Sequence, residues 1–285
     1  MADVKYTKVK SDSDLMLDIH GLRVKFLSTG KEAVKGIDFF MKPGQRVGLV
    51  GESGSGKTVT AMAISGLIER YNVEIEGEII FNGRDIRNCS REEMRRLQGR
   101  EIGVVFQEPM TSLNPLMKVG QQIEETLLLH TKRSKEERRE LAIEAMRKVG
   151  LPEPEVTYEK YPHQLSGGQR QRAMIASAMV ILPRLLICDE PTTALDVRVQ
   201  AQILKLLRDL SEEYGVGILL ISHDLRVIRQ LCDRVAVMYK GEIVEAGRTE
   251  KVFENPEHEY TKQLISAIPT REKVQIRKEG AGDEA

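Results

Sequence analysis

The chain has 285 residues, which is enough to bury a sizeable core in one large domain. Lysine and arginine together number 43, as do aspartate and glutamate, so the formal net charge is zero and a mainly nucleic-acid-binding surface is not expected. The three cysteines form no CxxC pair, which favours a reducing cytoplasm over a disulfide framework. Residues 1–14 lack the apolar core of a signal peptide and are expected to be flexible, and no apolar run approaches the roughly 18 residues that a membrane span needs.

Residues 15–50 alternate short apolar stretches with turns, which predicts β-strands. The last of these strands is the largely apolar run RVGLV at 46–50, a pattern typical of a buried parallel strand. It leads into the glycine-rich segment GESGSGKT at 51–58, which is followed by the helical pattern TVTAMAISGLI. A strand, a glycine-rich loop and a helix in this order are the context that a phosphate-binding loop requires.

The stretch from about 108 to 180 is charge-rich and has a helical pattern. Within it, Ser134 is a candidate N-cap with Glu137 three residues later, and Gly150 is a candidate stop for the same helix. We interpret this stretch as a helical subdomain inserted into an α/β core. Beyond it, strand patterns alternate again with helical ones, which predicts a mostly parallel sheet. Residues 271–285 are predicted to form a charged C-terminal tail.

The segment GESGSGKT matches the pattern G-x-x-x-x-G-K-[ST]. Its glycines allow backbone N–H groups to curl around a phosphate, and the following helix adds its dipole. Lys57 is expected to reach the outer phosphates of a nucleotide, and the hydroxyl of Thr58 is expected to hold Mg²⁺. A chance glycine-rich turn is the alternative, which the flanking strand and helix disfavour. The loop residues expected to bind nucleotide are Gly51, Ser53, Gly54, Ser55, Gly56, Lys57 and Thr58.

Polar side chains follow three further apolar runs. Asp189 and Glu190 end the run RLLICDE; we expect the first to assist Mg²⁺ and the second to polarise a water molecule as a general base. Gln107 follows IGVVF and could order the attacking water or Mg²⁺, or merely cap a loop. His223 follows GILLIS; a lone histidine is more often structural, but the ends of parallel strands converge on one site.

A second glycine turn, LSGGQ at 165–169, also indicates a helix N-terminus that faces an anion, although it contains no lysine. Five motifs occur in one order along the chain: GESGSGKT, FQEP, LSGGQRQR, LLICDEPTTALD and ISHD. In order and approximate spacing they resemble the nucleotide-binding subunits of ATP-binding cassette (ABC) transporters, across roughly residues 15–270. The resemblance implies ATP and Mg²⁺ as cofactors, with Gln107 as the Q-loop glutamine, Glu190 as the catalytic base, Asp196 as the D-loop aspartate and His223 as the switch histidine.

The resemblance also implies a fold class and a dimer. The expected fold is an α/β P-loop NTPase core with a mostly parallel sheet, an N-terminal antiparallel β-subdomain and the inserted α-helical subdomain. In the family, two cassettes pack head to tail, so the second glycine turn serves a nucleotide held by the partner. The residues expected to do so are Ser166, Gly167, Gly168 and Gln169. An aromatic residue usually stacks on the adenine, and Phe26 fits by position, although it could belong to the core and Phe39 and Phe40 lie nearby.

The segments at 107–123 and 254–269 resemble the oligopeptide/dipeptide importer branch of the family. The expected partners are therefore a second ABC ATPase subunit, identical or different, two transmembrane permease subunits and, indirectly, an extracytoplasmic substrate-binding protein. The chain is expected at the cytoplasmic face of the cell membrane, without a nucleic-acid partner. Oligosaccharides or nickel are alternative cargoes, because some members of the branch carry them. The cysteine-rich segment that often follows in this branch is missing, since residues 270–285 contain no cysteine.

Two rival interpretations come from other classes of protein. A soluble cassette ATPase of DNA repair, chromosome organisation or translation would carry long heptads, a second cassette or a basic excess, and this sequence has none of them. A nucleotide kinase would share the phosphate loop alone and would leave the LSGGQ and ISHD motifs unexplained.

Overall fold

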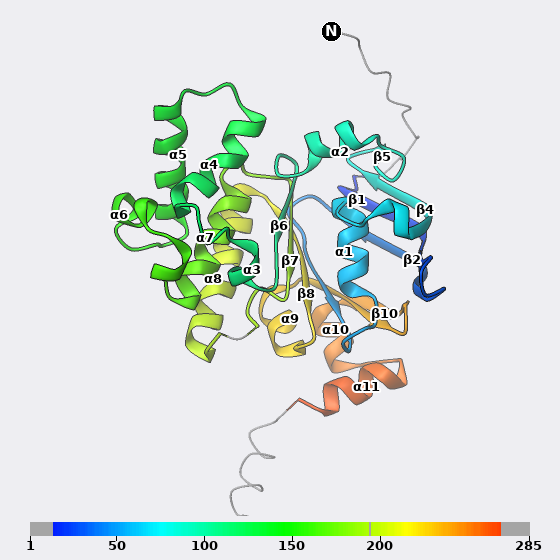
Figure 1. Ribbon diagram of the computed structural model, residues 1–285. Coiled ribbons are helices and arrows are strands. Elements are labelled where there is room, and N and C mark those ends of the chain that lie inside the picture. The colour runs from blue at the N-terminus through cyan, green and yellow to red at the C-terminus, as the bar shows by residue number, and fades with distance from the viewer. Residues whose placement is uncertain (1–13, 194, 269–285) are drawn as a thin grey trace, which may run out of the picture.

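The computed structural model describes residues 14–193 and 195–268. Within these ranges the chain forms two β-sheets, a group of helices beside the larger sheet, and two short C-terminal helices below it (Figure 1). The predicted tail at 271–285 lies outside the described residues, as does the predicted flexible N-terminus at 1–14 except for its last residue. No helix in the described ranges is both long and apolar enough to cross a membrane.

The larger sheet carries the strand ends on which the site is built. Its strands are β3 (Arg46–Val50), β6 (Ile102–Val105), β7 (Leu185–Asp189), β8 (Gly217–Ser222), β9 (Arg234–Tyr239) and β10 (Glu242–Arg248). They lie in the order β10-β9-β3-β8-β7-β6, and each pair is parallel except β9 with β10. The register pairs Val50 with Ser222 and Asp189 with Ile221, so neighbouring parallel strands end at the same edge of the sheet.

Both faces of this sheet are buried, each in its own apolar core. Neighbouring side chains of a strand point to opposite faces, so β8 contributes Ile218 and Leu220 to one core and Leu219 and Ile221 to the other. The first core includes helices α8 and α9, whereas the second includes α1 and the smaller sheet. These helices are α1 (Lys57–Ser65), α8 (Val197–Tyr214) and α9 (Leu225–Leu231). Burial on both faces explains why the central strands are almost continuously apolar.

The smaller sheet is antiparallel and has the order β2-β1-β4-β5. Its strands are β1 (Leu17–Phe26), β2 (Glu32–Met41), β4 (Val73–Phe81) and β5 (Arg84–Asp85). The last two strands follow α1 in the chain, so this sheet is assembled from segments on both sides of the phosphate loop. The predicted antiparallel β-subdomain is therefore present, and it extends beyond the N-terminal strands expected from the sequence.

Helices fill the stretch that the sequence marks as helical. They are α3 (Pro109–Ser112), α4 (Val119–His130), α5 (Lys135–Lys148), α6 (Pro154–Glu159), the 3₁₀ helix η2 (Pro162–Gln164) and α7 (Gly167–Met179). The predicted caps of α5 are confirmed: the backbone N–H of Glu137 donates to the Ser134 hydroxyl at 3.2 Å, and the N–H of Ser134 donates to the Glu137 carboxylate at 2.7 Å. Gly150, just beyond the helix, has the left-handed φ of 71° that ends many helices.

The remaining elements connect the two sheets and close the C-terminal side. They are the 3₁₀ helix η1 (Arg70–Asn72), α2 (Arg91–Leu97), α10 (Thr249–Glu254) and α11 (Glu259–Ser266). Figure 1 shows α10 and α11 below the larger sheet, after β10. The fold thus has the α/β class predicted from the sequence, with a mostly parallel sheet between two cores.

Candidate functional site: a nucleotide cavity at the strand ends

The phosphate loop begins at the end of β3 and passes into α1. Two of its glycines, Gly51 and Gly56, are needed because the surrounding backbone leaves no room for side chains there. A Cβ on Gly51 would lie 2.1 Å from the carbonyl oxygen of Met238, and one on Gly56 would lie 2.5 Å from that of Ala33. Gly56 also has a φ of 110°, which residues with a Cβ rarely adopt. The loop is thus packed tightly between β9 and β2 and exposes its backbone to the cavity.

Lys57 lies folded inside this loop, with only 5% of its surface exposed. Its ammonium donates hydrogen bonds of 2.8 Å to the carbonyl oxygens of Gly51 and Glu52. Burial lowers the pKa of Lys57, while the nearby carboxylates of Glu190, Asp189 and Glu52 oppose that shift. A buried ammonium held at the loop is placed to meet the charge of a bound phosphate group.

Thr58 and Asp189 bring two oxygens together next to the loop. The Thr58 hydroxyl donates a hydrogen bond of 3.3 Å to Oδ1 of Asp189. Burial raises the pKa of Asp189, and the neighbouring charge of Glu190 adds to this shift, whereas the hydrogen bond from Thr58 opposes it. A hydroxyl and a buried carboxylate are ligands that suit a hard cation such as Mg²⁺. A cation bound here would relieve the cost of burying the Asp189 charge.

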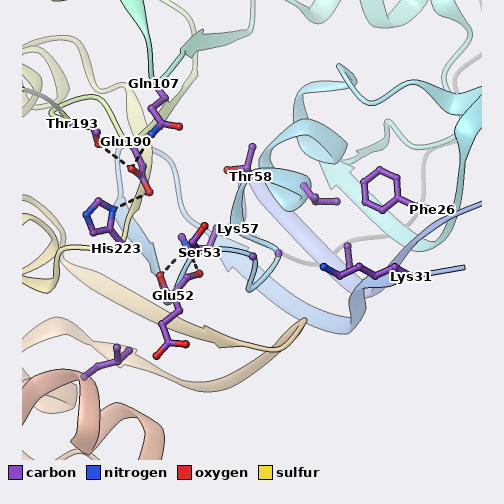
Figure 2. Close-up of a pocket in the computed structure, with 16 residues that line it drawn as sticks. Phe26, Lys31, Glu52, Ser53, Lys57, Thr58, Gln107, Glu190, Thr193 and His223 are labelled. Atoms are coloured by element: carbon purple, nitrogen blue, oxygen red, sulfur yellow. Dashed lines mark hydrogen bonds and ion pairs between the residues drawn. The ribbon is translucent and has the colours of Figure 1, made fainter. Parts of the chain in front are cut away.

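Glu190, directly after β7, is surrounded by three polar side chains (Figure 2). Its carboxylate lies 3.0 Å from Nδ1 of His223 and accepts hydrogen bonds from Thr193 at 2.9 Å and Gln107 at 3.3 Å. Burial raises the pKa of Glu190, but the hydrogen bonds to His223 and Thr193 and the charge of Lys57 outweigh it, so the net pKa lies below its usual value. The carboxylate is therefore ionised at neutral pH, as a general base must be.

The backbone of Glu190 is also unusual, since its φ is 45°. A residue with a Cβ in this left-handed region carries local strain, and such strain is concentrated at functional sites. The conformation turns the chain sharply after β7, while the N–H of Glu190 donates to the carbonyl oxygen of Ile221 at 2.9 Å. The side chain is thereby fixed relative to β8.

A cavity of about 710 Å³ joins these groups to the antiparallel sheet. Glu190, His223 and the phosphate loop line one end, and Phe26 and Lys31 line the other (Figure 2). Of the three phenylalanines considered for adenine stacking, Phe26 alone lines this cavity. Phe39 is buried in the core, and Phe40 is 41% exposed elsewhere on the surface.

Several cavity residues were missed by the sequence interpretation. They are Lys31, Ala33, Glu52, Val59, Thr193 and Leu264. Thr193 had a signal, because it lies three residues after Glu190 in the motif DEPTT, and a hydroxyl at that spacing can fold back onto the carboxylate. Lys31 belongs to no motif that we recognised. Leu264 lies in the segment 254–269 that resembles the importer branch, but nothing in that resemblance indicated a place beside the nucleotide.

The second glycine turn forms the start of α7, not a wall of the cavity. The Gln169 N–H donates to the Ser166 hydroxyl at 3.3 Å, and the Ser166 N–H donates to the Gln169 side chain at 2.9 Å, which closes a capping box. The residues of this turn that do not line the cavity are Ser166, Gly167, Gly168 and Gln169. Within this chain the structure thus brings together the predicted site except for this turn and Asp196.

Asp196 lies beside that second turn. Its carboxylate accepts hydrogen bonds from the backbone N–H groups of Arg198 at 3.0 Å and Val199 at 2.9 Å, which caps α8. A Cβ on Gly168 would lie 2.8 Å from Cγ1 of Val199, so the first turns of α7 and α8 are in close contact. The two helix N-termini therefore form one surface.

Comparison with known families agrees with this geometry. The profile described as ABC transporter matches residues 34–193, a range that contains the phosphate loop, the second glycine turn and Glu190. The chain belongs to the ABC transporter family. A second profile, described as the C-terminal region of oligopeptide/dipeptide transporters, matches residues 244–284. The family resemblance inferred from the five motifs is therefore confirmed.

Relatives and solved structures extend this ABC assignment over most of the chain. The oligopeptide transport ATP-binding protein OppD of Bacillus subtilis is 48% identical over 260 residues, which cover 90% of this chain and 73% of OppD. The dipeptide transport ATP-binding protein DppD of the same organism is 44% identical over 257 residues, covering 89% of this chain and 77% of DppD. The dimeric cassette MJ0796, in a post-hydrolysis state with ADP and Pi, superposes with a TM-score of 0.73 at 30% identity, covering 82% of this chain and 99% of MJ0796. The ABC chain described here is accordingly an ATPase whose substrate is ATP.

Proposed function

We propose that this ATPase powers the uptake of oligopeptides or dipeptides through a membrane importer. The observation that carries the proposal is the match of residues 244–284 to the C-terminal region of oligopeptide/dipeptide transporters. That segment lies beyond residues 34–193, the range matched by the general ABC transporter profile, so it is the part of the chain that marks this branch. The names of the OppD and DppD relatives, which refer to oligopeptide and dipeptide transport, support the same cargo.

In the proposed mechanism, the phosphate loop and Lys57 bind the outer phosphates of ATP, and Phe26 stacks on the adenine. Glu190 accepts a proton from the attacking water, while His223 and Thr193 keep its carboxylate ionised and oriented. Gln107, which donates to the same carboxylate, would help to orient the attacking water beside it. The strained backbone of Glu190 fixes the direction of the base before substrate arrives.

Thr58 and Asp189 would hold the Mg²⁺ that accompanies ATP, with Gln107 close by as a further oxygen ligand. Their oxygens already lie 3.3 Å apart and are of the type that Mg²⁺ prefers. The bound ion supplies charge neutralisation at the phosphate oxygens. Asp189 contributes the negative charge that balances the ion, and Thr58 contributes its hydroxyl oxygen.

The proposed working unit is a head-to-tail pair of cassettes, identical or different. In such a pair, the turn at Ser166 and the neighbouring Asp196 would complete the nucleotide site of the partner subunit, which explains why they lie outside this chain's own cavity. The pair would sit at the cytoplasmic face of the membrane on two permease subunits, which receive cargo from an extracytoplasmic binding protein. We assign residues 15–270 to the cassette, with the helical subdomain at about 108–180 and a tail at 271–285.

The experiment that tests this proposal is purification of the tagged chain from its native membranes in mild detergent. Mass spectrometry should identify two multi-span proteins in the complex, with or without a second cassette chain. The ATPase rate of that complex should rise when a peptide-loaded binding protein is added, and sugar-loaded and nickel-loaded binding proteins are the matched comparisons. If the ATPase rate rose only with the sugar-loaded or only with the nickel-loaded binding protein, that cargo would replace peptides in the assignment. Recovery of the chain only in the soluble fraction would contradict a transport role.

A further inference from the structure

Helix α11 reaches the phosphate loop although it lies more than 200 residues away in the chain. The hydroxyl of Tyr260 accepts a hydrogen bond of 2.9 Å from the backbone N–H of Glu52, the second residue of the loop. Only 6% of Tyr260 is exposed, so its side of this contact is buried. One helical turn later, Leu264 lines the nucleotide cavity itself. The C-terminal segment thus contacts both the loop and the cavity.

Tyr260 is held in place by its own neighbours. Glu245 on β10 accepts hydrogen bonds from the backbone N–H groups of Glu257 at 2.9 Å and His258 at 3.0 Å, which fixes the turn before α11. The ring of His258 then caps the helix, because its Nδ1 accepts from the N–H of Tyr260 at 3.1 Å. The Tyr260 ring packs on that of Tyr239, with ring centroids 4.1 Å apart. The hydroxyl therefore meets the loop from a fixed position.

The peptide groups of Glu52 link Tyr260 to the functional lysine. The N–H of Glu52 donates to Tyr260, and its carbonyl oxygen accepts from the Lys57 ammonium at 2.8 Å. At a second residue of the loop, the N–H of Gly241 donates to the carbonyl oxygen of Ser55 at 2.9 Å. The loop is thus held at two residues, by the β9–β10 turn and by α11. Loss of either contact would allow the loop more conformations before nucleotide binds.

We propose that Tyr260 is a positioning residue of the ATP site and that α11 supplies part of the wall of this site through Leu264. The hydroxyl of Tyr260 orders the phosphate loop in its binding conformation, which reduces the entropy cost of binding. This inference rests on the proposed assignment of the cavity to ATP. It gives the C-terminal segment a role inside the catalytic subunit itself.

The first test is the full-length variant Tyr260→Phe, which keeps the ring and removes the hydroxyl. Tyr214→Phe, on α8 with its hydroxyl beside Lys148, is the matched control. In Tyr260→Phe, the Kd for ATP and ADP and the KM for ATP should rise about three- to tenfold, as the loss of one hydrogen bond implies, while kcat changes less than twofold. Tyr214→Phe should match wild type. Unchanged nucleotide affinity in Tyr260→Phe would overturn the inference, and so would an equal loss in Tyr214→Phe.

The second test places a charge on the wall that α11 provides. Leu264→Asp should weaken ATP binding more than Leu264→Asn, which has nearly the same shape, and added salt should narrow the difference because it screens charge repulsion. Equal affinities of the two variants for ATP at low salt would show that residue 264 does not lie beside bound ATP. Lys57→Ala distinguishes a failure of the ATP-site assignment from a failure of the role proposed for α11. If it still binds ATP, the cavity assignment fails; if it loses ATP while Tyr260→Phe does not change, only the role of α11 fails.

Discussion

Nδ1 of His223 lies 3.0 Å from Oε1 of Glu190, so the residues that follow two adjacent parallel strands are joined by their side chains. The contact helps to hold the pKa of Glu190 below its usual value against the opposing effect of burial. It also links the proposed general base to β8, the strand that pairs directly with the one leading into the phosphate loop. Only β8 thus separates the strand that carries the proposed base from the strand that leads into the phosphate loop.

Replacing Glu190 by Gln should stop hydrolysis without preventing ATP binding. The amide has nearly the same shape but cannot accept the proton of the attacking water, and general-base catalysis contributes roughly 10²–10⁴ in rate. We therefore expect kcat to fall by about that factor, while the Kd for ATP stays near that of wild type and an ATP-bound pair accumulates in size-exclusion chromatography. Lys57→Ala, in contrast, should lose binding itself. Turnover near the wild-type rate in Glu190→Gln would show that another group is the base.

Ser166→Ala tests whether the second glycine turn serves another subunit. The control is Ser134→Ala, because both serines close the same kind of capping box and each loss costs about 1 kcal/mol of stability. Only Ser166→Ala should also lower ATP turnover, by about ten- to a hundredfold, since a hydrogen bond to a charged group contributes roughly 1.5–3 kcal/mol. Calorimetry on the monomer should give an unchanged ATP affinity. Weaker monomer binding would place Ser166 in this chain's own site.

Phe26→Ala should weaken nucleotide binding by removing the surface on which the adenine stacks. Stacking of a base on an aromatic ring contributes roughly 1–3 kcal/mol, so the Kd for ATP should rise about five- to 150-fold. Phe26→Tyr should restore affinity because it restores the ring. Phe40→Ala is the matched control, since that exposed ring lies outside the cavity and packs near the Arg234 guanidinium. Equal effects in the two alanine variants would indicate a general loss of packing.

The stability of the helical subdomain should depend on alkaline pH through Tyr158. Its hydroxyl donates to the buried carboxylate of Glu124, and burial together with that contact raises the pKa of Tyr158 to about 12 from its usual 10.0. The folded state therefore favours the neutral phenol. Its contribution to stability is complete below pH 10 and is lost as the pH rises towards about 12.

Tyr158→Phe leaves Glu124 without this partner, which should cost about 1–3 kcal/mol at neutral pH. Urea unfolding at several pH values measures the difference between wild type and variant. The difference should shrink between pH 10 and pH 12, where the wild type loses its advantage. A difference that stays constant over that interval would contradict the raised pKa.

The parts of the site that could be predicted from the sequence are those whose chemistry is local. The phosphate loop is recognisable because glycine spacing, lysine and threonine must follow one another within a single turn. Glu190 and His223 are recognisable because each follows an apolar run, and the ends of parallel strands meet at one edge of a sheet. In both cases the pattern that identifies the residues is contained within about ten residues of the chain.

Contacts between distant segments could not be predicted in this way. Tyr260 accepts a hydrogen bond from Glu52 only because α11 folds back under the sheet. The sequence pattern of neither segment indicates that contact. Strand β4 illustrates a different reason, because a strand pattern was present but its partner was not evident. Its alternation of Glu74, Glu76 and Glu78 with apolar residues is a strand signal, yet its pairing with β1 spans the phosphate loop and α1.

The contact of Gly168 with Val199 leaves no room for a methyl group between the start of α7 and the start of α8. Asp196 caps α8 and follows Glu190, the proposed general base, by six residues. The segment that leaves the proposed base therefore ends beside the glycine turn that is proposed to serve the other nucleotide. In the proposed head-to-tail pair, each subunit would therefore join its own nucleotide site to that of its neighbour through this close contact between two helix starts. A side chain larger than that of glycine at position 168 would push the two helix starts apart and so disturb both sites at once.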